Sequence, residues 1–146
     1  MANNVVAVEA GNMLAASLGI ASYTAFGTTG GLGHLKLISG TSGANTSNST
    51  NTTAGTEVTG GSYTAFPIPA SGAFWPSSAP STGSVTNSGG AATFTNMPAT
   101  TTYGIEIWDN TGTPVRKWWG SLTASKTTGA GDTLTFPASS ITITLA

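Results

Sequence analysis

The chain has 146 residues and a formal net charge of −1, and only 6% of its residues are Asp, Glu, Lys or Arg. An ordinary soluble domain carries about 25% of such residues. The length suits a single domain with a core of its own. So little charge excludes a basic surface for nucleic acid or an anionic membrane, and it leaves few groups for acid–base, metal or phosphate chemistry. A structural or binding role, against copies of itself or a larger surface, is therefore expected.

Apolar residues recur at helical spacing near the start of the chain, at positions 6, 10, 13, 14 and 18. Asn4 can cap the start of a helix, and Gly19 can lie just past its end. This spacing predicts an amphipathic helix over residues 5–18, within an N-terminal helical arm of residues 1–20. Because the outer face of such a helix is almost uncharged, we expect it to dock on another surface.

Residues 21–146 are expected to form one β domain. The run from His34 to Ser39, HLKLIS, alternates between apolar and polar side chains and is the first strand candidate. Residues 40–62 are rich in Gly, Ser, Thr and Asn and predict a long exposed loop. The prolines of the extended segment 63–69 suit the edge of a sheet.

The second half of the chain alternates most clearly. Residues 84–87 and 92–95 flank Ser88-Gly89-Gly90 and predict a hairpin. Residues 102–108 and 115–122 predict two strands that are joined by a turn over residues 109–112. Two more strand candidates, at 134–137 and 141–145, close the chain. About eight short strands with turn signals between them predict an all-β, antiparallel sandwich that follows the N-terminal helix.

No group of residues carries a strong signal for chemistry. His34 is the only imidazole and has no acidic or Ser neighbour in the sequence. Glu106, Asp109 and Asp132 are the carboxylates that a glycosidase-like site would use, but their positions favour turn-forming and structural roles. No carboxylate cluster suits Ca²⁺, and the Gly-rich run of residues 27–33 lacks the Lys-Ser/Thr of a phosphate loop. We therefore expect no enzymatic activity, no catalytic residue, no metal and no cofactor.

The four Trp residues at 75, 108, 118 and 119 allow three interpretations: core, subunit interface or sugar binding. Since consecutive strand residues point to opposite faces, only one of Trp118 and Trp119 can enter a single core. We favour an interface for the other. Arg116 and Lys117 are the only adjacent cations, and they could meet an acidic patch on a partner or keep an edge strand soluble.

Three blocks of the sequence resemble a family of small actinobacteriophage virion proteins. Residues 56–63 read TEVTGGSY and resemble the TEVSGGSY block of that family. Residues 103–109 read YGIEIWD and look like its WGIWD block. The region from Trp119 to Ala138 is similar to its closing WGALT…K…AGDTLTFPAG region. The resemblance spans roughly residues 14–145, and such proteins are labelled tail fibre, minor tail or head decoration proteins.

The resemblance implies a virion component, and the favoured interpretation is a capsid decoration protein on the outer surface of the major capsid protein lattice. We expect it to cement capsid subunits and to associate with copies of itself, as in a homotrimer. The candidate interface residues are Val6, Met13, Leu14, Leu18, Phe66, Ile68, Arg116, Lys117, Trp118 and Trp119. The alternative is a minor tail or tail-fibre component that contacts the host, with a host glycan as a partner. A cell-wall hydrolase is the third and least favoured interpretation.

Overall fold

The computed structural model describes residues 3–5, 18, 33–40, 55–69, 73–75 and 84–144. Every regular element of the described residues is a strand, and all strand pairs are antiparallel. The strands are β1 (Asn3–Val5), β2 (His34–Ile38), β3 (Phe66–Pro67), β4 (Ser84–Thr86), β5 (Ala92–Phe94), β6 (Thr100–Trp108), β7 (Arg116–Thr128), β8 (Leu134–Phe136) and β9 (Thr142–Thr144). The predicted all-β, antiparallel class is thus confirmed.

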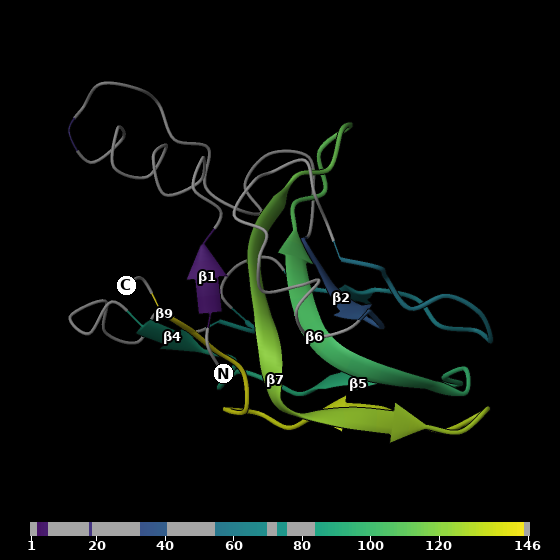
Figure 1. Ribbon diagram of the computed structural model, residues 1–146. Helices are drawn as coiled ribbons and strands as arrows, with labels where there is room; N and C mark the ends of the chain where they lie inside the picture. The colour runs from purple at the N-terminus through teal and green to yellow at the C-terminus, as the bar shows by residue number, and fades with distance from the viewer. Residues whose placement is uncertain are drawn as a thin grey trace.

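The largest sheet has five strands in the order β1-β7-β6-β2-β3 (Figure 1). Its centre is the hairpin of β6 and β7, the two longest strands. The predicted turn after Trp108 joins them. The Asp109 Oδ1 atom accepts hydrogen bonds from the Val115 N–H at 2.8 Å and from the Thr111 hydroxyl at 3.0 Å. One carboxylate therefore holds both ends of this turn, as short polar side chains commonly do.

The strands that precede the β6–β7 hairpin pair with the strands that follow it, and they keep the same register. β5 pairs with β8 and β4 pairs with β9, so the three pairs are nested around a single turn. The register is seen in three pairs: Ser84–Thr144, Ala92–Phe136 and Thr100–Thr128. From each pair to the next, the position changes by the same number of residues before the turn as after it. One register therefore runs through all three pairs until it shifts within β6–β7, where both strands bend (Figure 1).

The predicted hairpin of residues 84–87 and 92–95 is wrong. β4 and β5 each pair with a strand near the end of the chain and not with each other. The Asn87 side chain explains the difference, because its amide donates to the carbonyls of Gly90 and Pro137 at 2.9 and 3.0 Å, and its Oδ1 accepts from the Ile141 N–H at 2.8 Å. This fully buried side chain connects the segment between β4 and β5 with the segment between β8 and β9. The sequence alone indicates only a local turn there.

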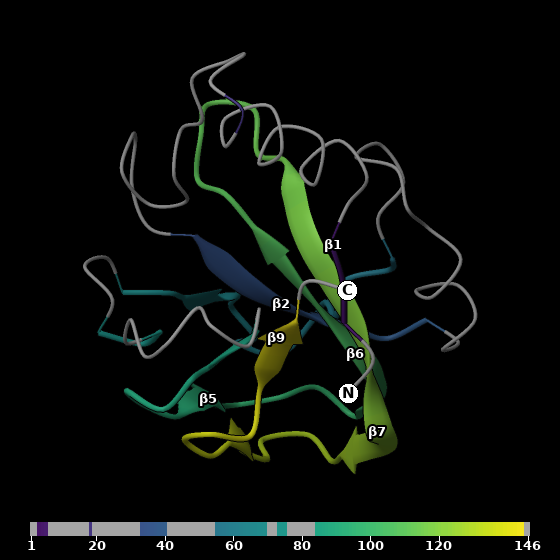
Figure 2. The ribbon, with the colours of Figure 1, turned by 90° about the vertical axis from the view of Figure 1, so that its left-hand side faces the viewer.

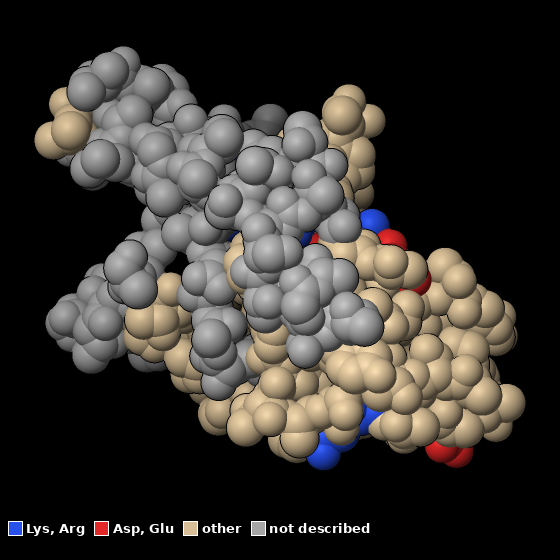
Figure 3. Space-filling view, viewed as in Figure 1, with Lys and Arg blue, Asp and Glu red and all other residues tan. Residues whose placement is uncertain are grey.

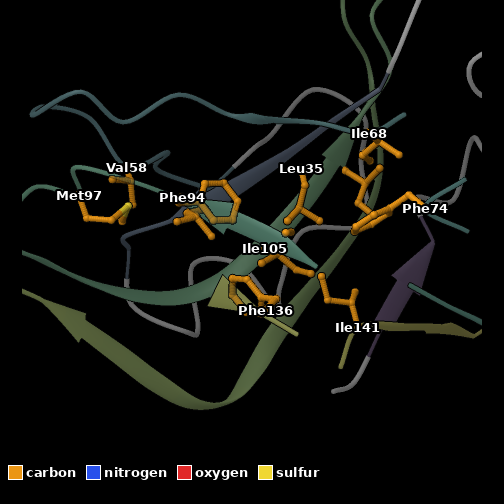
Figure 4. Close-up of a cluster of buried hydrophobic side chains, with 12 residues drawn as sticks. Leu35, Val58, Ile68, Phe74, Phe94, Met97, Ile105, Phe136 and Ile141 are labelled. Carbon is orange, nitrogen blue, oxygen red and sulfur yellow. The ribbon is translucent and has the colours of Figure 1, made fainter. Parts of the chain in front are cut away.

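The core lies where β2 and β6 of the large sheet face the β5–β8 pair. Leu35 and Leu37 on β2 are fully buried, as the alternation of that strand predicts. The Phe94 ring lies 6.2 Å from the rings of both Phe66 and Phe136. Figure 4 shows these apolar side chains converging from the several elements. In Figure 2, β9 lies in front of β2 and β6, and its Ile143 side chain packs against this core.

Residues 56–63 cover the outer edge of β2 beyond its pairing with β3. The Val58 N–H donates to the Leu37 carbonyl at 2.8 Å, and Glu57 forms an isolated bridge with Ile38. Val58 is buried, and Gly60 and Gly61 both have positive φ and turn the chain back. The predicted loop of residues 40–62 is thus attached to β2 through Glu57 and Val58, whereas Thr56 and residues 59–62 are exposed as predicted, and residues 41–54 lie outside the described residues.

The N-terminal prediction is tested only at its start. Val5, the first residue of the predicted helix, ends the strand β1 and pairs with Trp118 of β7. Val6, Met13 and Leu14 lie outside the described residues, as does nearly all of the predicted helix. The Leu18 side chain is described and is 64% exposed.

Candidate functional site

The chain has only four Lys and Arg residues, and three of them form ion pairs near one end of the large sheet. The pairs are Lys36–Glu57, Arg116–Glu106 and Lys117–Asp109, with N–O distances of 2.9, 3.0 and 3.6 Å. In Figure 3 the described surface is almost entirely uncharged, and one of its few gatherings of blue and red lies over β2 and the end of β6. The scarce charge of this protein is therefore concentrated.

Glu106 and Arg116 form the buried part of this group. The Glu106 carboxylate accepts hydrogen bonds from the Arg116 guanidinium at 3.0 Å, the Gly55 N–H at 2.8 Å and the Trp108 indole at 2.9 Å. Both side chains are almost fully buried. Such a pair survives in a core because each charge is compensated by its partner and by further hydrogen bonds. Arg116, one of the predicted interface residues, is thus buried, and its charge is paired within the chain.

Lys36, Glu57 and Tyr63 form the partly exposed part of the group. The Lys36 ammonium lies 2.9 Å from Glu57 and 4.8 Å from the centre of the Trp108 ring. The Tyr63 hydroxyl donates to Glu57 at 3.2 Å and accepts from the Leu37 N–H at 3.0 Å. Burial raises the pKa of Tyr63 well above its ordinary value. This hydroxyl replaces a missing strand partner on β2, while it also fixes the carboxylate that holds Lys36.

The three carboxylates of the glycosidase-like hypothesis have separate structural partners. Glu106 is held by the buried pair described above, and Asp109 holds its own turn. Asp132 accepts a hydrogen bond from the Gly129 N–H at 2.7 Å, in the turn between β7 and β8. The structure therefore places these carboxylates in turn-forming and ion-pair positions, in agreement with the interpretation that the sequence favours.

A hollow of about 260 Å³ opens beside the ion pairs. It lies between β2, the end of β6, the turn after Trp108 and the segment that covers the edge of β2. The described residues that line it are His34, Lys36, Glu57, Ala65, Trp108, Asp109, Asn110 and Pro114. His34, at the start of β2, and Asn110, in the turn, make no side-chain hydrogen bond or ion pair with the rest of the described chain. Among the described residues, these two side chains therefore have hydrogen-bonding groups without a partner.

The predicted interface residues are mostly occupied within the chain. Ile68 and Trp119 are buried, and Phe66 lies half-buried in the edge strand β3. Trp118 is half-buried against the core, and Lys117 is paired with Asp109. Trp118 and Trp119 face opposite sides of the sheet, yet both are largely covered. Trp108 is also half-buried, and it is the Trp residue that lines the hollow.

Sequence reasoning missed this hollow because its residues come from four separate segments. Glu57 falls within the predicted loop of residues 40–62, His34 begins a predicted strand and Asp109 opens a predicted turn, so local patterning does not bring them together. One available signal was the scarcity of charge itself, since Lys36 faces Glu106 across β2 and β6 in the register. Another was the TEVTGGSY block, whose Glu57, two glycines and Tyr63 form the compact cover of the β2 edge.

The described residues contain no group of three or more His, Cys, Asp and Glu side chains that could hold a metal ion. None of the described segments forms a helix of the length and apolar character needed to cross a membrane. The described lining of the hollow presents one aromatic ring, an imidazole, an amide and paired charges. Such a set can bind a polar ligand through hydrogen bonds and ring contact.

Comparison with known proteins gives one family. The model of a family described as podophage GP4 fiber I protein gp80 matches residues 41–144, which is more than half of the chain. No curated protein matches the sequence significantly. The match supports the predicted virion location, and it favours the tail-fibre alternative over the capsid decoration interpretation. We conclude that the chain belongs to the family of the podophage GP4 fiber I protein gp80 and is a fibre-like phage virion protein.

Proposed function

We propose that this protein is a non-enzymatic component of the phage tail fibres and that it contacts the host surface. The observation that carries the proposal is the match to a fibre protein family over residues 41–144. The composition agrees with this role, because a chain with so few ionisable groups is suited to lasting contacts with protein neighbours and neutral surfaces. The structural engagement of Glu57, Glu106, Asp109 and Asp132 supports a binding role over a hydrolytic one.

The location on the particle is tested by labelling purified phage with an antibody against this chain and viewing it by electron microscopy. Label confined to the tail region supports the proposal. Label spread evenly over the head contradicts it and supports capsid decoration instead. The number of copies per particle, measured by quantitative mass spectrometry, is an independent check, because decoration of a capsid lattice requires hundreds of copies.

Host contact is tested separately with the purified protein. We expect it to bind isolated envelopes of the host and to slow phage adsorption when it is added in excess. Absence of binding in both assays contradicts host contact, even if the tail location holds. Release of soluble fragments from the envelopes, lost in Glu106→Gln, would contradict the non-enzymatic role.

A further inference from the structure

The hollow beside Trp108 combines features that a binding site needs and that fold stability does not require. It is lined on one side by β2 and β6 of the large sheet, and on the other by the turn that Asp109 holds. Binding groups that are fixed by a rigid scaffold lose little freedom when a ligand arrives. Its volume of about 260 Å³ lies just below the roughly 300–1,000 Å³ of sites for drug-sized ligands, so the ligand is small.

The aromatic wall of the hollow is held in one orientation. The Trp108 indole N–H donates to the buried Glu106 carboxylate at 2.9 Å, and the Lys36 ammonium lies over one face of the ring, 4.8 Å from its centre. Trp108 itself is half-buried, so part of its surface remains open to the hollow. An aromatic surface of this kind packs well against the C–H groups of a ring-shaped polar molecule. Because the Trp108 side chain is already ordered in the fold, binding costs little further side-chain entropy.

The polar wall offers both donors and acceptors. His34 and Asn110 have no side-chain hydrogen bond to any other described residue, and an amide and an imidazole can each donate and accept. The Lys36 ammonium has three donor hydrogens, of which Glu57 uses one or two. The hollow can thus satisfy several hydroxyl groups that point in different directions around one small ring.

Among the described residues, the charged side chains that line the hollow are all engaged in ion pairs. Lys36 is compensated by Glu57, and Asp109 is compensated by Lys117. Lys117 is not among the described residues that line the hollow, but its contact leaves Asp109 ion-paired. A charged ligand would therefore meet groups that are already ion-paired, and it would gain little for the hydration that it gives up. The electrostatics therefore favour a neutral ligand.

We propose that this hollow binds one neutral sugar residue. If the proposed contact with the host is correct, on which the source of the sugar rests, this residue belongs to a polysaccharide of the bacterial surface. His34 and Asn110 donate to and accept from its hydroxyl groups, and the Trp108 ring lies against its C–H face. The hollow holds only one residue, so tight attachment of a phage would come from many copies acting together.

The proposal is tested by titrating the full-length, isotope-labelled protein with glucose, galactose, mannose, rhamnose and N-acetylglucosamine while recording amide and indole NMR signals. We expect at least one sugar to bind with a dissociation constant on the order of millimolar, as its few atoms allow. The shifted signals should include the Trp108 indole and the amides of His34 and Asn110. The matching uronic acid, which carries a negative charge, should bind more weakly.

Two variants separate binding from folding. His34→Ala and Asn110→Ala remove side chains without described hydrogen bonds, and each should weaken binding about two- to tenfold while the remaining spectrum stays unchanged. Lys126→Ala is the matched control. Its exposed side chain lies six residues along from the end of β6 in the paired register, roughly 20 Å from the hollow, and binding should persist.

No shift with any of the five sugars overturns the proposal, and so does a shift pattern that is unchanged in both variants. Neither result would affect the proposed function if the protein still binds host envelopes. Conversely, sugar binding that depends on His34 and Asn110 supports the hollow as a site even if electron microscopy places the protein outside the tail.

Discussion

Two buried side chains, Glu106 and Arg116, show how a chain with little charge uses what it has. Ten residues separate them in the sequence, and the β6–β7 hairpin brings them to 3.0 Å. The Glu106 carboxylate also anchors Gly55 and Trp108, so it links the cover of the β2 edge to the wall of the hollow. At the scale of single residues, the fold and the candidate site thus depend on the same carboxylate.

The substitution Arg116→Met should lower the free energy of unfolding by about 3–5 kcal/mol, because it leaves the Glu106 charge buried without its counter-ion. Adding Glu106→Gln should recover part of this loss, since the remaining buried group is then neutral. Urea denaturation followed by Trp fluorescence measures both values. A loss below 1 kcal/mol for the single variant would show that this pair is hydrated and not buried.

The raised pKa of Tyr63 predicts that the free energy of unfolding falls at alkaline pH. Burial raises its pKa in the folded chain, whereas the unfolded chain ionises near the ordinary value of about 10. Below that value both states keep the proton and the contribution of Tyr63 is constant. Above it the unfolded state loses its proton first, so the free energy of unfolding falls as pH rises.

The substitution Tyr63→Phe removes the ionisable hydroxyl, so a comparison with the native chain isolates the contribution of Tyr63 to the pH dependence of stability. The variant should be less stable near neutral pH by about 1–3 kcal/mol, because the Leu37 N–H loses its acceptor. Its stability should decline less steeply than that of the native chain between about pH 10 and 11.5. Parallel curves for the two proteins over this range would contradict the assignment.

At the scale of elements, the segment between β4 and β5 packs closely against the backbone of residues 73–74. Gly89 lies against the backbone of Ala73 and donates its N–H to the Phe74 carbonyl at 3.3 Å. A Cβ at this position would collide with the Ala73 carbonyl. Glycine is therefore required here for space, while the sequence pattern alone indicates only a turn.

Gly89→Ala should destabilise the fold by about 1–3 kcal/mol, since the chain must move apart to admit the methyl group. Gly112→Ala is the matched control, because a Cβ there meets nothing within 4 Å. It should be neutral or should stabilise by up to about 1 kcal/mol through the unfolded chain. Thermal unfolding by circular dichroism compares the two, and equal melting temperatures would contradict the expected collision.

At the scale of the whole molecule, β1 completes the large sheet by pairing with residues 118–120 of β7. Removal of residues 1–5 should expose this edge of β7, including the backbone beside both Trp118 and Trp119. The loss of a few ladder hydrogen bonds should lower stability by about 1–3 kcal/mol, and the exposed edge should promote association.

Size-exclusion chromatography with light scattering and a thermal melt test this expectation. The truncated chain should melt several degrees lower and should form larger species as its concentration rises. Leu18→Ser, which changes an exposed side chain, should leave both properties unchanged. A truncated chain with native behaviour would show that β1 adds nothing to the sheet.

The sequence predicts strand positions well where side chains alternate, as in β2, β6, β7 and β9, because local patterning decides which face is buried. It predicts the turn at Asp109 for the same local reason. It fails for the partners of β4 and β5, since the Asn87 contacts that decide them reach residues 137 and 141. The hollow could not be predicted because its walls meet only after β2, β6 and residues 55–65 have folded together.

The nested pairs of the C-terminal half have a consequence for how this chain folds. β4 and β9 are far apart in the sequence, but once β6 with β7 and β5 with β8 have paired, only two short interruptions separate their ends. Each new pair then closes a short loop, and its entropic cost is small. The strand pairs can thus form in order, starting from the hairpin at the Asp109 turn. The pairing of β4 with β9 can then form at nearly the rate of a local contact.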